Sequence, residues 1–217
     1  MPSARTRTIL IAAVVIMAAG GVTTAYAAGP QDGPGTRPAA GAKEASVRGA
    51  ADFQMPFAPD KDVRHFEFEA RAAPYTRPFP AAPHGLPSDA AGTVKVSHYL
   101  ARQNTTVHFE AAVDCMITSP GYAALTAKVV RVDDLVQDWL GKRLGFSIQD
   151  AGADTPGRTR DRVGFSWLFG NVEEDQDGNA IEGKVGTCQA PAPFASVTKG
   201  GYTVKHAELT PPPPGAG

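Results

Sequence analysis

The feature of this sequence that most constrains its fold is a five-residue phrase that occurs twice. Residues 143–147 read Arg-Leu-Gly-Phe-Ser, and residues 162–166 read Arg-Val-Gly-Phe-Ser. Each copy alternates apolar and polar residues around its phenylalanine, which is the pattern of a half-buried strand. The segment 149–158 between them is rich in Gly, Asp and Pro, and this composition favours a loop. The phrase therefore predicts two strands joined by a long loop, and its glycines indicate a bulge or a close backbone approach.

The same alternation recurs elsewhere in the chain. Residues 65–70 place Phe66 and Phe68 on one face and two glutamates on the other, as a half-buried strand does. Residues 133–141 carry Leu, Val and Trp at helical spacing before a glycine, which predicts one short helical turn. Residues 193–199 predict a second short helix. We expect further strands at 93–99, 105–117, 122–132, 184–189 and 201–209.

This succession of short strands predicts an all-β fold. About eight strands separated by Gly, Pro and Asp turns are typical of a single antiparallel β-sandwich or a small β-barrel. One or two short helical turns complete the expected architecture. Within it, residues 105–117 and 122–132 flank Ser119-Pro120-Gly121 and predict a hairpin in which Cys115 points inward.

The N-terminal segment indicates export. Arg5 and Arg7 precede the apolar run 9–19, and Ala25-Tyr26-Ala27 follows as a small-residue cleavage motif. This is the pattern of a secretory signal peptide over residues 1–27, cleaved after Ala27. A retained membrane anchor is the alternative, but the run is short for a membrane span. We therefore expect a secreted protein without a stable membrane span in the mature chain.

The rest of the chain divides by composition. Residues 28–51 are mostly Gly, Pro and Ala and predict a flexible linker. Residues 52–210 predict the β domain, and the proline-rich residues 211–217 predict a disordered tail. Removing the signal leaves 19 of the 21 basic residues against 22 acidic ones. Because this charge is so mild, we expect no nucleic-acid partner.

The chain has two cysteines, Cys115 and Cys188. In an oxidising compartment such a pair most simply forms one disulfide, and two buried free thiols are the alternative. Neither cysteine has a Cys or His partner at the spacing of a zinc site. No cofactor is indicated.

One group of residues suggests acid–base chemistry. If the strands 93–99 and 105–117 pair, His98 and His108 could approach each other with Asp114 nearby, which is the composition of a catalytic or metal site. Histidines on the solvent faces of strands are the simpler interpretation. Ser147 and Ser166 are poor nucleophile candidates because neither has the second glycine of a nucleophile elbow.

The acidic segment 173–182 suggests a calcium loop. Asp175, Asp177 and Asn179 alternate as the first ligands of an EF-hand do. The pattern then fails, because Ala180 stands where the loop needs glycine and Gly186 where it needs the bidentate glutamate. A solvated hairpin tip is the alternative.

Four aromatic residues suggest a ligand pocket. Trp139, Phe146, Phe165 and Trp167 lie in or beside predicted strands and could line the interior of a barrel, as in lipocalin-like proteins; Phe169 could join them. An ordinary hydrophobic core is the alternative.

With these residues placed, the chain resembles a group of small, uncharacterised secreted proteins of actinobacteria of the Streptomyces type, loosely labelled "repetin"-like. The resemblance spans about residues 93 to 209. It implies a secreted, disulfide-bonded β domain and no activity, so no catalytic residue carries over from it. Its motifs are Ser97-His98, Val113-Asp114-Cys115, the two Gly-Phe-Ser phrases, Cys188 and the ending Gly200-Gly201-Tyr202-Thr203-Val204-Lys205-His206.

Two kinds of function remain open from the sequence. The first is a secreted non-enzymatic module that binds an extracellular protein, a cell-envelope component or a small molecule. The second is a ligand-binding barrel with a hydrolase or isomerase site near His98, His108 and Asp114.

Overall fold

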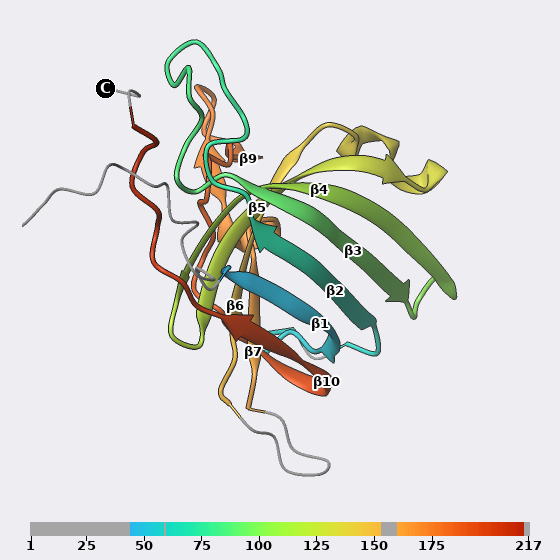
Figure 1. Cartoon of the computed structure of the whole chain (residues 1–217). Helices are drawn as coiled ribbons and strands as arrows, with labels where there is room; N and C mark the ends of the chain where they lie inside the picture. The colour runs from blue at the N-terminus through green and yellow to red at the C-terminus, as the bar shows by residue number, and fades with distance from the viewer. Residues whose placement is uncertain (1–43, 59, 153–159, 215–217) are drawn as a thin grey trace, which may run out of the picture. The chain divides into compact units, whose positions relative to one another are not determined.

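The computed structural model of the protein describes residues 44–58, 60–152 and 160–214 (Figure 1). The expected signal peptide at 1–27 and the expected linker up to residue 43 lie outside the described residues. So do residues 215–217 of the expected tail, whereas residues 211–214 are exposed and lack regular secondary structure. Within the described residues, no helix has the length and apolar character that a membrane span requires.

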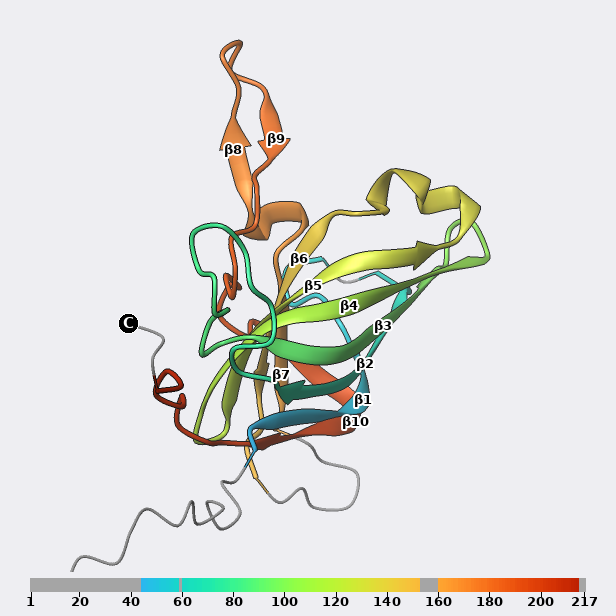
Figure 2. The ribbon, with the colours of Figure 1, turned by 45° about the horizontal axis from the view of Figure 1, so that its top comes forward.

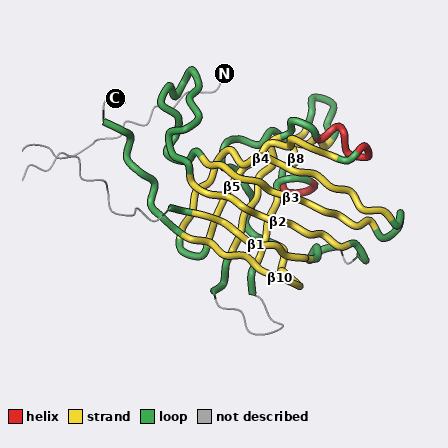
Figure 3. The backbone as a smooth tube through the Cα atoms, turned by 45° about the vertical axis from the view of Figure 1, so that its right-hand side comes forward, coloured by secondary structure: helices red, strands yellow, loops and turns green. Residues whose placement is uncertain are grey.

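Of the ten strands in the described residues, eight close into an antiparallel barrel (Figure 1 and Figure 3). Each strand from β1 to β6 pairs with the next in sequence, and β10 closes the ring by pairing with β7 and β1. The all-β prediction is confirmed, and the barrel replaces the sandwich alternative. The barrel strands are β1 (Ser46–Phe53), β2 (Val63–Ala72), β3 (Ala90–Leu100), β4 (Thr105–Ser119), β5 (Tyr122–Val132), β6 (Arg143–Gln149), β7 (Arg162–Phe165) and β10 (Ala195–Lys205).

The interior of the barrel is packed with aromatic rings that alternation directs inward. In β2, Phe66 and Phe68 are almost fully buried, while Glu67 and Glu69 lie on the outer face. The Phe66 ring lies 4.6–6.3 Å, centroid to centroid, from the rings of Phe53, Phe68, Phe146 and Phe165. Burying each such ring stabilises the fold by roughly 2–3 kcal/mol.

The repeated phrase forms the adjacent strands β6 and β7, as predicted. Phe146 pairs with Phe165 in register, and both rings point into the core. The glycines face outward, where residues 183–194, here called the strap, cross the barrel. A Cβ atom on Gly145 would collide with the carbonyl oxygen of Gln189, and one on Gly164 would collide with that of Ala192. The predicted close backbone approach is confirmed, and β6 pairs with β5 and β7 without a register shift.

A disulfide fastens the strap to the barrel. Cys115 on β4 is bonded to Cys188, with Cα atoms 5.3 Å apart and a sequence separation of 73, so the predicted pairing is confirmed. In the chain-entropy model a loop of this length stabilises the fold by roughly 4 kcal/mol. The predicted strand at 184–189 is wrong, because this segment makes a turn in which Cys188 has a positive φ of 56°.

The strap also covers a buried ion pair. The Asp114 carboxylate lies 2.7 Å from a guanidinium nitrogen of Arg143 and accepts a hydrogen bond of 2.6 Å from the Thr126 hydroxyl. The Thr126 oxygen in turn accepts the backbone N–H of Cys188 at 3.2 Å. Asp114 is therefore part of the structure beneath the strap.

Two predicted boundaries are wrong at the seam where the barrel closes. The expected linker runs to residue 51, but β1 begins at Ser46 and pairs along its whole length with β2 and β10. The expected helix at 193–199 belongs mostly to β10, in which Ala195 and Val197 are buried. Both segments are rich in small residues, so their extended form follows from pairing with distant strands rather than from local preference.

The up-and-down order brings four connections to the same end of the barrel, here called the mouth. These are the connections β1–β2, β3–β4, β5–β6 and β7–β10. The predicted helical turn in the β5–β6 connection is confirmed as the 3-10 helix η1 (Asp134–Trp139). The β7–β10 connection holds the 3-10 helix η2 (Leu168–Gly170) and an exposed hairpin of β8 (Val172–Glu174) and β9 (Ala180–Glu182), which stands out from the barrel (Figure 2).

Candidate ligand cavity at the barrel mouth

A cavity of about 390 Å³ opens at the mouth, above the phenylalanine core. Four strands and the helix η1 contribute to it, and most of its lining is aromatic or aliphatic. The polar contributors are Arg64, His98 and Gln103. The apolar lining consists of Phe66, Val96, Leu100, Val107, Phe109, Leu135, Val136, Trp139, Phe165 and Trp167.

Two tryptophans from different connections form one side of the cavity. Trp139 ends η1, and Trp167 is the N-cap of η2, two residues after β7. Their rings meet edge to face at 5.6 Å, and the Phe109 ring lies 5.4 Å from Trp139. Lys142 contacts Trp139 in two ways. Its backbone N–H donates a hydrogen bond to the Trp139 carbonyl at 3.0 Å, and its side-chain ammonium lies 5.4 Å from the centroid of the Trp139 ring. This is a cation–π geometry.

Three of the five aromatic residues predicted to form a ligand pocket line the cavity, and two do not. Trp139, Phe165 and Trp167 line the cavity. Phe146 lies deeper, is fully buried, and packs its ring 5.6 Å from Trp167. Phe169 lies outside the cavity lining, half exposed, with its ring 4.4 Å from that of Phe57.

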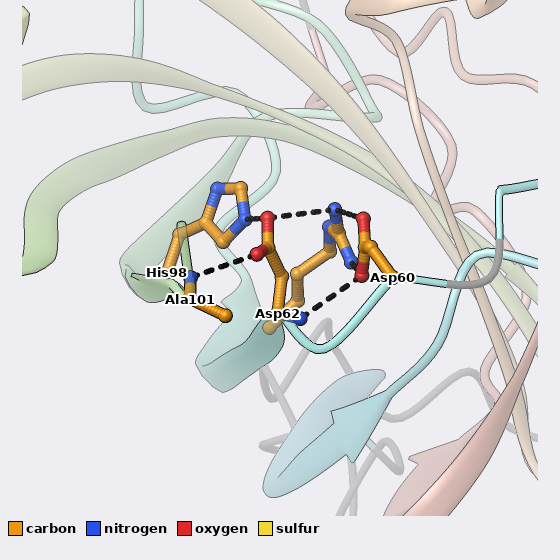
Figure 4. Close-up of polar contacts among 5 residues, drawn as sticks. Asp60, Asp62, His98 and Ala101 are labelled. Atoms are coloured by element: carbon orange, nitrogen blue, oxygen red, sulfur yellow. Dashed lines mark hydrogen bonds and ion pairs between the residues drawn. The ribbon is translucent and has the colours of Figure 1, made fainter. Parts of the chain in front are cut away.

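A group of charged residues, here called the polar wall, forms another part of the mouth (Figure 4). Arg64 and His98 are cross-strand partners on β2 and β3. The Asp62 carboxylate accepts hydrogen bonds from Arg64 at 3.3 Å, from the His98 Nε2 at 2.9 Å and from the Ala101 N–H at 2.9 Å. The Asp60 carboxylate accepts hydrogen bonds from both terminal guanidinium nitrogens of Arg64, at 3.0 and 2.7 Å.

The polar wall is half-buried and electrostatically paired. The side chains of Arg64 and Asp62 are 11% and 15% exposed, and that of His98 is 29% exposed. The hydrogen bonds from Arg64 hold the pKa of Asp60 below its usual range, against an opposing effect of partial burial. The paired geometry fixes the orientation of the His98 ring at the edge of the cavity.

The structure does not bring together the three residues predicted for acid–base chemistry. His98 lines the cavity, but His108 lies on the outer face of β4 and bonds Asp133 through Nδ1 at 2.9 Å. That hydrogen bond lowers the pKa of the exposed Asp133 carboxyl. Asp114 lies under the strap. His98 and His108 diverge because the cross-strand partner of His108 is Ser97, one residue before His98, and successive residues of a strand point to opposite faces.

The predicted calcium loop is the tip of the β8–β9 hairpin. The Asp175 carboxylate accepts the N–H groups of Asp177 and Asn179 at 3.0 and 2.8 Å, and the Asn179 side-chain amide at 3.1 Å. These bonds, chiefly those from Asn179, lower the pKa of Asp175. The Asp175 carboxylate thus caps its own turn at an exposed hairpin tip, and the calcium site stays a prediction. In the described residues, no three His, Cys, Asp or Glu side chains are grouped to hold a metal ion.

Sequence reasoning missed Asp60, Asp62 and Arg64. One signal could have indicated Arg64, because it shares a strand face with Phe66 and Phe68 and must therefore point inward. An inward arginine needs a buried or half-buried acidic partner. Which acid supplies it depends on the path of the β1–β2 connection, and this path has no local sequence signature.

Comparisons with known proteins found no match to a protein family, to a curated protein or to a solved structure.

Proposed function

We propose that this chain is a secreted, non-enzymatic binding module that holds a small, mainly apolar molecule in the cavity at the barrel mouth. The observation that carries the proposal is the contrast within the barrel interior. Its centre is filled by phenylalanine rings, whereas its mouth keeps about 390 Å³ of space lined by Trp139, Trp167 and Phe109. Apolar cavities with a few convergent polar groups are the usual form of small-molecule sites.

The size of the cavity limits the ligand. Small-molecule pockets range from roughly 300 to 1,000 Å³, so this one belongs to the small end. A single ring with short substituents, or a fused pair of rings, fits such a space. A long acyl chain does not, because the phenylalanine core closes the barrel below the cavity.

Two features support an extracellular setting. The disulfide between Cys115 and Cys188 suits an oxidising compartment. The pattern of residues 1–27 is that of a secretory signal. The resemblance to secreted actinobacterial proteins agrees with both.

Tryptophan fluorescence tests the proposal directly, because both tryptophans of the chain line the cavity. Titration with para-tert-butylanisole, a compact apolar probe, should change the emission of the folded protein saturably. Val107→Phe places a larger side chain in the cavity and should weaken binding by about tenfold or more. Phe57→Ala removes an exposed aromatic outside the cavity and should leave binding unchanged.

A result in which Val107→Phe remains folded and binds the probe as the unchanged protein does would refute the cavity as the site. A result in which no apolar probe of this size binds at all would refute the proposed function itself.

A further inference from the structure

The polar wall determines which nitrogen of His98 is available to a ligand. The Asp62 carboxylate can only accept hydrogen bonds, and it lies 2.9 Å from the His98 Nε2. Nε2 must therefore carry the proton of this bond. In the neutral ring the other nitrogen, Nδ1, is then a hydrogen-bond acceptor.

The second ring nitrogen of His98 is turned away from Asp62 (Figure 4). No hydrogen bond joins Nδ1 to another described residue, and His98 is one of the polar residues that line the cavity. With its ring neutral, His98 thus offers an acceptor of fixed orientation at the edge of an aromatic cavity. A ligand that brings an O–H donor to this nitrogen gains a hydrogen bond, whereas a purely apolar ligand leaves the nitrogen without one.

The charges of the wall argue against an anionic ligand. Arg64 is already bonded to two carboxylates, those of Asp60 and Asp62. The two carboxylates of the wall outnumber its one guanidinium, so the wall offers no free arginine to a carboxylate ligand. A cationic ligand at Trp139 would meet a like charge, because the Lys142 ammonium already lies 5.4 Å from the centroid of that ring.

We propose that the ligand is a neutral hydroxylated ring compound of the phenol class. This inference rests on the proposed function of the cavity. The ring of the ligand lies against Trp139, Trp167 and Phe109, and its hydroxyl donates a hydrogen bond to the His98 Nδ1. Asp62 acts as the positioning residue, since it sets both the orientation and the protonated nitrogen of the imidazole.

Two probes of nearly equal shape separate this inference from the proposed function. Para-tert-butylphenol carries the O–H donor, and para-tert-butylanisole keeps the ring and the oxygen but has no donor. Calorimetric titration of the full chain should show the phenol binding about two- to tenfold more tightly, the gain typical of one net hydrogen bond. Equal affinities would overturn the hydroxyl inference and leave the apolar site intact.

Variants of His98 and His108, each of which is paired with an aspartate at 2.9 Å, provide the matched comparison. His98→Phe keeps a ring but removes the acceptor, so the affinity ratio of phenol to anisole should fall to about one. His108→Phe removes the outer-face histidine, which has the same 2.9 Å bond to an aspartate, and should leave the ratio unchanged. His98→Leu, a smaller side chain, repeats the test if phenylalanine narrows the cavity. A ratio that survives loss of His98 would contradict the inference, whereas failure of both probes to bind the unchanged protein would instead remove the proposed function.

Discussion

The outer face under the strap and the mouth of the barrel are built partly from the same strands, yet the first is closely packed and the second contains a cavity. Under the strap, Gly145 and Gly164 let backbone approach backbone, and a disulfide fastens the covering segment. At the mouth, strands β2, β3 and β4 lead to a cavity with tryptophans on one side and a paired polar wall on another. The first region is closed by contact, and the second keeps an open volume.

The comparison shows which polar groups the fold itself requires. Asp114 is almost fully buried and is neutralised by Arg143, so it belongs to the stability of the covered face. The polar wall pairs its charges in the same way but leaves the His98 ring at the edge of an open space. An aromatic cavity beside an oriented imidazole is the geometry on which the proposed function rests.

Removing the disulfide that fastens the strap should cause the largest loss of stability and should leave ligand binding at the mouth unchanged. Replacing both Cys115 and Cys188 by serine should lower the free energy of unfolding by about 2–5 kcal/mol, measured by urea titration. Probe binding to the fraction that remains folded should be unchanged. A loss of binding that accompanies an intact fold would show that the two regions are coupled.

Filling the space between strap and barrel should have the next largest effect. In Gly145→Ala the added methyl group meets the carbonyl oxygen of Gln189, and such overpacking costs about 1–3 kcal/mol. Thermal and urea unfolding measure the loss. Gly141→Ala is the control, because a Cβ atom there has no neighbour within 4 Å; its positive φ of 83° still adds backbone strain, so only a larger loss at Gly145 supports the strap contact.

The smallest expected effect is the pH dependence that Asp60 contributes at the mouth. The hydrogen bonds from Arg64 hold its folded-state pKa below the ordinary aspartate value of 3.8. The stabilisation is therefore complete above about pH 4 and is lost as the pH falls through the lower folded-state pKa. Asp60→Asn should cost less than about 1 kcal/mol at neutral pH, since the carboxylate is more than a third exposed.

The difference in unfolding free energy between Asp60→Asn and the unchanged chain should shrink as the pH is lowered. A difference that grows on acidification would contradict the assigned direction of the pKa.

The parts of the structure that sequence could predict are those with local signals. Phe66 and Phe68 alternate with glutamates, and the two Gly-Phe-Ser phrases alternate in the same way, so the core strands were predictable. The cysteine pair was predictable from its number and expected compartment. Strand β1 was not, because four of residues 46–51 are small and the segment becomes a strand through pairing with β2 and β10.

Only the aromatic lining of the candidate site was predictable from the sequence; the polar wall was not. Trp139, Phe165 and Trp167 are large aromatic residues beside strands, which is a sufficient signal for a core or a pocket. The Asp62–His98 pair joins residues that are 36 positions apart, and only the register of β2 with β3 brings them together. The closure of the sheet into a barrel likewise depends on β10 meeting β1 from the other end of the domain.

The most direct test of the account is a nitrogen–proton correlation spectrum of the labelled protein titrated with para-tert-butylphenol. The two tryptophan side chains give two indole N–H signals, and both belong to residues of the cavity lining. The account predicts that both signals shift together and saturate with the affinity found by calorimetry. If the backbone spectrum shows a folded barrel and neither indole signal moves while other signals do, the mouth is not the binding site.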